Sequence, residues 1–270
     1  MLCFPNCKIN LGLYVTRRRD DGYHDIETVF YPVQLQEVLE IVPSAETKLY
    51  VSGLAVAGSN ADNLVWKAYG LLQKNYPGKL LPLDIYLHKI IPMGAGLGGG
   101  SADGAFMLKL LNDHFNLSIN AAQLAAYALE LGSDCPFFIH NTPAFATGRG
   151  EQMSNSALDL SGYSIQLICP KVHVSTGVAF QMIAPRPAPV DLRQLSALPI
   201  EQWKGTISND FEAPVFQQHP VLAAIKEQLY RQGSIYASMS GSGSAIFGIF
   251  PKKQKATIKA DTPFEVFYME

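Results

Sequence analysis

Five glycines fall within seven residues, at 94–100, of this 270-residue chain. Without a Cβ atom, glycine backbone can adopt left-handed conformations and turn consecutive N–H groups inward. An apolar helical pattern follows, and the N-terminal end of that helix would add N–H donors and a partial positive charge. These features predict a loop that binds nucleotide phosphates, with the Ser101 hydroxyl available to a phosphate oxygen or a bound Mg²⁺. The whole loop is Pro92-Met93-Gly94-Ala95-Gly96-Leu97-Gly98-Gly99-Gly100-Ser101-Ala102.

Three other interpretations of this loop are weaker. The spacing Gly94-x-Gly96-x-x-Gly99 also occurs in dinucleotide-binding units, but such a unit needs a second strand that ends in an acidic residue about 20 residues on. Here the acid near that distance, Asp113, lies in a helical pattern. A Walker A loop would close with Gly-Lys-Ser or Gly-Lys-Thr, which this loop lacks. A glycine-rich turn without a ligand would cost chain entropy with nothing to offset it.

The elements that must position the loop follow from apolar periodicity. Strict alternation predicts a half-buried strand at 83–88, directly before the loop, and helical spacing predicts a helix at 101–114, directly after it. Asn120 is expected to cap the next helix, which ends at Gly132. Further strands are expected at 8–15, 28–34, 37–42, 144–147, 164–169, 245–250 and 264–268, and further helices at 62–74 and 220–233. This mixed order predicts an α+β architecture with two lobes.

Composition and charge argue against several classes of protein. With 48% hydrophobic and 16% charged residues the chain can bury a large core, and its net charge of -2 with no long basic run argues against a nucleic-acid partner. The cluster Arg17-Arg18-Arg19 is followed at once by two aspartates, which favours a solvated turn. We expect no membrane-spanning segment, no signal peptide and no zinc site, and therefore a cytoplasmic protein with reduced cysteines.

The glycine loop and the segments around it resemble the GHMP kinases, a superfamily that includes galactokinase, homoserine kinase and mevalonate kinase. Matching segments occur in order along nearly the whole chain, at 5–11, 19–28, 62–64, 131–138, 208–210 and 240–243. The element Asp21-Gly22-Tyr23-His24 narrows the resemblance to one branch, whose substrate carries a cytidine diphosphate group. The chain departs from the family pattern at Pro5-Asn6-Cys7-Lys8, at Ala102 and at Cys135, and none of these departures removes a side chain with a chemical role.

The resemblance implies a two-lobed α+β fold of mixed sheets and helices, with ATP and substrate in the cleft between the lobes. The N-terminal domain would cover residues 1–155 and the C-terminal domain residues 156–270. It implies an ATP-dependent kinase that phosphorylates an alcohol in non-mevalonate isoprenoid precursor synthesis, with Mg²⁺ as cofactor and no protein metal ligand assigned. The partners would be ATP and a cytidine-diphosphate-linked small molecule, with the chain as a monomer or homodimer. Alternatives are a GHMP kinase of the mevalonate or homoserine type, and a nucleotide-binding protein without catalysis.

Two residues would carry the chemistry, according to the resemblance. Asp134 would be the base that takes the proton of the accepting hydroxyl, at the end of a helix beside Gly132. Lys8 would lie on the first strand with Asn10 on the same face, and pairing with Asp134 would offset the cost of burying its charge. Lys8 would either orient the base or stabilise the transferred charge. The alternatives are an ordinary turn aspartate and a surface lysine with a buried stem.

Five residues are candidates for substrate binding. An aromatic side chain can stack on the flat face of a cytosine base, and an imidazole can hydrogen-bond to its edge. A lone histidine is more often structural, but this one follows Asp-Gly-Tyr in the matching element. The resemblance therefore implies a substrate site formed by Asn10, Tyr23, His24, Thr176 and Phe180.

Two further residues are candidates for nucleotide binding. The resemblance places Asn63 and Lys89 around the adenine and ribose, although Lys89 is equally compatible with a surface position at the end of a strand. The second glycine turn, Gly241-Ser242-Gly243, is expected to approach the substrate's phosphates or to form a tight turn without a ligand.

Overall fold

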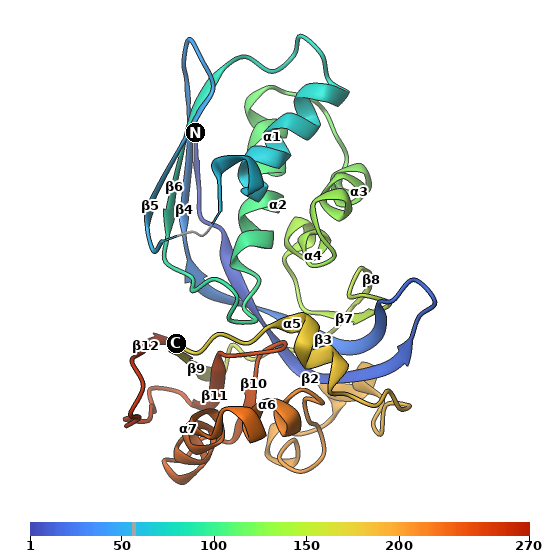
Figure 1. Cartoon of the computed structure of the whole chain (residues 1–270), viewed down its shortest axis with the longest axis vertical. Coiled ribbons are helices and arrows are strands. Elements are labelled where there is room, and N and C mark those ends of the chain that lie inside the picture. The colour runs from blue at the N-terminus through green and yellow to red at the C-terminus, as the bar shows by residue number, and fades with distance from the viewer. Residues whose placement is uncertain (56–57) are drawn as a thin grey trace. The chain divides into compact units, whose positions relative to one another are not determined.

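A computed structural model describes residues 1–55 and 58–270, and these residues form two compact units (Figure 1). Unit 1 consists of Met1–Cys7, Gln34–Met93 and Gly98–Asn141, and unit 2 of Lys8–Val33, Gly94–Leu97 and Thr142–Glu270. The chain therefore passes from one unit to the other several times. The division at residue 155 that the sequence suggested stays a prediction.

Unit 1 contains a four-stranded sheet in the order β1-β4-β6-β5. The β4 strand pairs antiparallel with both β1 and β6, whereas β5 runs parallel to β6. Buried apolar side chains alternate with more exposed polar or aromatic ones from Leu83 to His88 of β6, as the sequence predicted. The strands are β1 (Leu2–Cys3), β4 (Val38–Pro43), β5 (Lys48–Gly53) and β6 (Leu83–Lys89).

The helices of unit 1 lie on one face of this sheet (Figure 1). The predicted cap of α3 is confirmed, because Asn120 Oδ1 accepts a hydrogen bond from the backbone N–H of Gln123 at 2.9 Å. Gly132 ends the same helix, as expected. The helices are the 3₁₀ helix η1 (Asn60–Asp62), α1 (Leu64–Asn75), α2 (Gly99–His114), α3 (Ala121–Leu131) and α4 (Cys135–His140).

Unit 2 contains most of a sheet in the order β2-β3-β7-β8 and all of an antiparallel sheet in the order β10-β11-β9-β12. The two long strands β2 and β3 begin or end in unit 1. The first sheet consists of β2 (Asn6–Arg18), β3 (His24–Gln36), β7 (Ala144–Thr147) and β8 (Gln152–Asn155). The second consists of β9 (Tyr163–Pro170), β10 (Tyr236–Met239), β11 (Ile246–Pro251) and β12 (Phe264–Met269).

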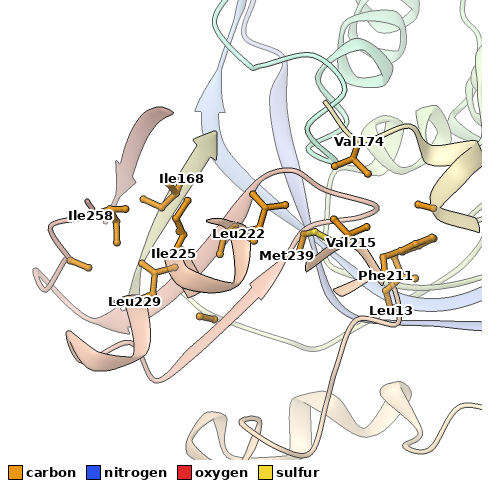
Figure 2. Packing of buried hydrophobic residues seen from close by; sticks show 14 of the residues in the cluster. Leu13, Ile168, Val174, Phe211, Val215, Leu222, Ile225, Leu229, Met239 and Ile258 are labelled. Carbon is orange, nitrogen blue, oxygen red and sulfur yellow. The ribbon is translucent and has the colours of Figure 1, made fainter. Parts of the chain in front are cut away.

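A hydrophobic core joins the second sheet to the helices of unit 2 (Figure 2). The apolar face of α7, with Leu222, Ile225 and Leu229, packs against Ile168 of β9 and Met239 of β10. Each of these aliphatic side chains is nearly inaccessible to solvent, and full burial of one stabilises the fold by roughly 1.5–3 kcal/mol. The helices are α5 (Thr176–Gln181), η2 (Leu192–Ala197), η3 (Ile200–Gln202), α6 (Glu212–Gln218) and α7 (Pro220–Arg231).

The α+β class predicted from the sequence is confirmed, since both units combine helices with sheets. Among the described residues, no helix has the length and hydropathy needed to cross a bilayer.

Candidate active site

The glycine loop connects β6 to α2 and has the left-handed backbone that its composition predicted. Gly94, Gly96 and Gly98 have φ angles of 68°, 78° and 72°, a region that other residues adopt only with strain. The residues between them, Ala95 and Leu97, are buried. The loop therefore alternates between a left-handed glycine and an anchored apolar residue, which fixes the direction of each peptide plane.

The central part of the loop is docked against the second glycine turn within unit 2. The Ser240 hydroxyl donates a hydrogen bond to the Gly96 carbonyl oxygen at 2.8 Å, and the Ala245 N–H donates to the Ala95 carbonyl oxygen at 3.1 Å. A Cβ atom added at Gly96 would overlap the carbonyl oxygen of Ser240. Glycine is therefore required at this position for close packing as well as for its φ angle.

Lys8 lies at the start of a buried polar network in unit 2. Its side-chain ammonium donates a hydrogen bond to Asn10 Oδ1 at 2.7 Å and lies 4.9 Å from the centroid of the Phe30 ring. The Asn10 amide in turn donates to the Thr28 hydroxyl at 3.0 Å. Only 4% of the Lys8 surface is exposed, so the alternative of a surface lysine is wrong. Lys8 and Asn10 lie on the same face of β2, as the sequence predicted. The catalytic role of Lys8 stays a prediction.

Asp134 occupies the N-cap position of the short helix α4, a helix that the sequence did not predict. The prediction placed it at the end of α3, and the structure adds that α4 begins immediately after it. The Cys135 thiol forms a hydrogen bond with the Ser101 side chain, and burial raises the pKa of this thiol to about 12. The start of α4 therefore lies against the start of α2 within unit 1, on the side where the glycine loop enters the helix.

Two of the predicted substrate residues stack on each other in unit 2. The rings of His24 and Phe180 are nearly parallel, with centroids 4.9 Å apart and an interplanar angle of 14°. Phe211 supports this pair with an edge-to-face contact at 4.8 Å from Phe180. Residues from β3, α5 and the segment before α6 are thus brought together, although they are far apart in the sequence.

The other predicted substrate residues are placed differently. Thr176 of α5 shares a hydrogen bond with Ser242 of the second glycine turn, at 2.9 Å between the two hydroxyl oxygens. Asn10 lies beside the same turn, because the Ser240 hydroxyl is 3.5 Å from its Oδ1 atom. Tyr23 is 57% exposed, and the Arg149 guanidinium lies over its ring at 4.9 Å from the centroid.

Asn209 is a positioning residue for which sequence reasoning assigned no role. Its amide donates to the carbonyl oxygens of Met239 and Gly241, both at 2.8 Å, and its Oδ1 accepts from the Phe211 N–H at 2.9 Å. It therefore fixes the second glycine turn and the support of the aromatic stack together. The matching segment at 208–210 was the available signal.

The two residues assigned to adenine and ribose both have structural partners in unit 1. Asn63 caps α1, since its Oδ1 accepts from the Val65 N–H at 2.9 Å. Lys89 is 2% exposed and forms ion pairs with Glu37 and Asp103, so a surface position for it is wrong. Nucleotide binding by Asn63 and Lys89 stays a prediction.

Comparison with known families and structures defines the class of protein. Residues 63–142 match the GHMP kinases N terminal domain and residues 195–262 match the GHMP kinases C terminal domain. A mevalonate kinase of Methanococcus jannaschii shares the fold, with a TM-score of 0.70 at 13% identity over 100% of this chain and 98% of that one. The fold is therefore that of the GHMP kinases.

More similar relatives narrow the assignment. The 4-diphosphocytidyl-2-C-methyl-D-erythritol kinase of Bacteroides thetaiotaomicron is 53% identical over 93% of this chain and 92% of its own length, and that of Bacteroides fragilis is 51% identical over 95% and 94%. A crystal structure of 4-(cytidine 5'-diphospho)-2C-methyl-D-erythritol kinase superposes with a TM-score of 0.78 at 33% identity, covering 92% and 90% of the two chains. The chain belongs to the 4-diphosphocytidyl-2-C-methyl-D-erythritol kinase family. The resemblance, the fold and the enzyme class predicted from the sequence are confirmed.

Proposed function

We propose that this chain transfers the γ-phosphoryl group of ATP to the 2-hydroxyl of 4-diphosphocytidyl-2-C-methyl-D-erythritol, in the non-mevalonate synthesis of isoprenoid precursors. The observation that carries this proposal is the identity of 53% with a relative of that name across 92% of its length. The stacked His24–Phe180 pair and the adjoining glycine turn support it, because a cytidine diphosphate presents a flat base and two phosphates.

The glycine loop binds the ATP phosphates in this proposal. Phosphoryl transfer depends mainly on positioning and on neutralising charge, since there is little covalent chemistry for the protein to perform. The left-handed glycines at 94, 96 and 98 orient backbone N–H groups, and α2 adds the donors of its first turn. The hydrogen bonds of this loop to the turn at 240–245 hold it in shape before the nucleotide binds.

Asp134 and Lys8 act on the reacting groups. As the substrate oxygen attacks the γ-phosphorus, its proton passes to the Asp134 carboxylate, and the bond from phosphorus to the β–γ bridging oxygen breaks to release ADP. The Lys8 ammonium stabilises the negative charge on the transferred group. Its hydrogen bond to Asn10 fixes it in place, which avoids reorganisation at the moment of reaction.

Mg²⁺ fits this site as an ion that arrives with the nucleotide. Residues 1–55 and 58–270 contain no group of three or more His, Cys, Asp or Glu side chains suited to a metal ion. Mg²⁺ does not need one, since it is commonly held by one or two protein groups together with substrate phosphates and water. The Ser101 hydroxyl, at the start of α2, would supply such a group. When bound, the ion neutralises charge on the phosphate oxygens.

Recognition of the cytosine ring falls to the aromatic residues of unit 2. The base stacks against the ring system of His24 and Phe180, and the imidazole nitrogens of His24 bond to its polar edge. Tyr23 is exposed and adjacent in sequence, which allows its ring to cover the other face. Thr176 and Ser242 then present hydroxyl groups to the diphosphate.

A substrate assay tests this function directly. Purified protein with Mg-ATP is given 4-diphosphocytidyl-2-C-methyl-D-erythritol, mevalonate or homoserine in parallel, and ADP release and the phosphorylated product are measured. We expect turnover with the first compound only. Turnover with mevalonate or homoserine would assign the chain to another GHMP activity, and ATP binding without any turnover would indicate a non-catalytic protein. A cytoplasmic location and a monomeric or homodimeric state remain predictions, to be tested by cell fractionation and light scattering.

A further inference from the structure

Three buried ionisable side chains meet in unit 1, close in sequence to the two ends of the glycine loop. The Lys89 ammonium lies 2.5 Å from Glu37 Oε2 and 2.6 Å from Asp103 Oδ2. The side chains of Lys89, Glu37 and Asp103 are 1%, 0% and 3% exposed. Lys89 is the last residue of β6, before the loop, and Asp103 lies on α2, after it. The ion triad of Glu37, Lys89 and Asp103 therefore connects the two sides of the loop.

Glu37 also holds the backbone that leads into the loop. Its Oε1 atom accepts hydrogen bonds from the N–H groups of Ile90 at 3.1 Å and Ile91 at 2.8 Å. The Ile91 side chain in turn packs against the loop's exit, since a Cβ atom added at Gly99 would lie 2.9 Å from Ile91 Cγ2. Both carboxylate oxygens of Glu37 therefore accept hydrogen bonds. One accepts from the backbone before the loop, and the other accepts from Lys89, which also contacts Asp103 of α2.

Stability alone does not account for such a triad. Desolvating ions is costly, and a buried ion pair commonly stabilises a fold no better than apolar side chains of similar volume. Burial, followed by the hydrogen bond to Glu37, raises the pKa of the Asp103 carboxyl. A protonated Asp103 would donate to Glu37 and accept from Lys89, which leaves one negative charge against one positive charge. The triad therefore fixes the positions of Glu37, Lys89 and Asp103 relative to one another, rather than adding to the free energy of unfolding.

We propose that Glu37, Lys89 and Asp103 are positioning residues that hold the two ends of the glycine loop at the spacing needed to bind the ATP phosphates. This rests on the proposed function, because the spacing matters only if the loop binds a nucleotide. A loop whose ends are fixed in advance loses less conformational entropy on binding. The triad therefore acts on ATP affinity through the loop, without contact with the reacting atoms.

Glu37→Gln is the main test. The substituted amide keeps an oxygen for the two backbone N–H groups but presents an N–H₂ group to the Lys89 ammonium, so that donor faces donor. We expect the KM for ATP to rise by about ten-fold or more and the KM for the alcohol substrate to change by less than about two-fold. Asp103→Asn is the conservative partner, since an amide reproduces the donor and acceptor of a protonated carboxyl, and its KM for ATP is expected within about three-fold of the wild type.

A stability control separates positioning from a structural role. Leu111→Ala removes buried atoms from α2 about two turns beyond Asp103, and it should lower the melting temperature with no change in the KM for ATP. Amide hydrogen exchange of the 90–103 segment should be faster in Glu37→Gln and unchanged in Leu111→Ala. If Glu37→Gln does not fold, Glu37→Gln/Lys89→Met removes both charges together, and the same rise in KM is expected.

The outcomes distinguish this proposal from the function on which it rests. A wild-type protein that fails to phosphorylate the substrate overturns the proposed function. An active wild type, together with Glu37→Gln and Glu37→Gln/Lys89→Met proteins whose KM for ATP and exchange rates match those of Leu111→Ala, overturns the positioning role.

Discussion

Asp134 is the residue whose replacement tests the proposed chemistry most directly. Asp134→Asn keeps the shape of the side chain but removes the proton acceptor, so kcat should fall by about 100-fold or more. ADP affinity, measured by calorimetry, should change by less than about three-fold, because the substitution leaves the loop that we propose to bind the phosphates untouched. A variant with near-normal turnover would remove Asp134 from the role of base.

Asp103 gives a prediction on the pH dependence of stability. Its pKa in the folded protein is raised, mainly by burial, so its contribution is fully present below the unfolded value of about 3.9 and is lost as pH rises toward the folded value. Asp103→Asn does not titrate. The free energy of unfolding of the wild type, relative to that of Asp103→Asn, should therefore decrease from pH 4 upward. Urea denaturation at a series of pH values measures this difference, and a difference that increases with pH would contradict it.

Gly94 and Gly96 of the glycine loop allow backbone strain to be separated from close packing. Gly96 and Gly94 have similar φ angles of 78° and 68°, but a Cβ atom would overlap the Ser240 carbonyl oxygen at Gly96 and would meet nothing within 4 Å at Gly94. Gly94→Ala should cost only backbone strain, about 1 kcal/mol, whereas Gly96→Ala should cost at least about 2 kcal/mol more and weaken ADP binding. Melting curves and calorimetry of both variants decide the matter, and equal losses would show that the docking of the loop is unimportant.

The sequence predicted most clearly the elements in which an apolar pattern repeats over many residues or in which a capping residue marks an end. The β6 strand, α2 and α3 have alternating or helical apolar patterns, and Asn120 and Gly132 mark the ends of α3. The six-residue helix α4 could not be predicted, because one and a half turns carry too little periodicity and its Pro-Phe-Phe run is equally apolar on all sides. The strands β5, β8 and β10 were also missed, although the four-residue strand β7 was predicted at its observed bounds.

The sequence predicted which residues form the candidate site better than it predicted which of them contact one another. Lys8 and Asn10 were expected on one face of a strand, and in the structure Lys8 Nζ lies 2.7 Å from Asn10 Oδ1. Glu37 gave no signal, because it appeared as the first residue of a strand at 37–42, and its partners lie 52 and 66 residues further along the chain. Contacts over such separations depend on the tertiary fold, which local patterns do not encode.

The chain passes several times between the two units, so a cut at one point in the sequence does not separate them. The core of unit 2 contains Leu13 of β2 beside Phe211. The Leu13 N–H donates to the Ser208 carbonyl oxygen at 2.9 Å, and the Asp210 N–H donates to the Leu13 carbonyl oxygen at 2.8 Å. The C-terminal half of the chain thus relies on a strand from the first twenty residues for both packing and hydrogen bonds.

A fragment of residues 156–270 should therefore not fold by itself, although the sequence suggested it as a domain. It lacks β2 and β3, which removes Leu13 from the core around Phe211 and leaves the Ser208 carbonyl oxygen and the Asp210 N–H without their partners. An unpaired buried polar group costs about 1–3 kcal/mol. We expect no cooperative thermal transition by circular dichroism and no dispersed amide spectrum for this fragment. Mixing it with a fragment of residues 1–155 should restore both signals, since the mixture supplies the missing strands. A cooperative transition in the isolated fragment would show that its own core is sufficient and that β2 only adds to a domain already formed.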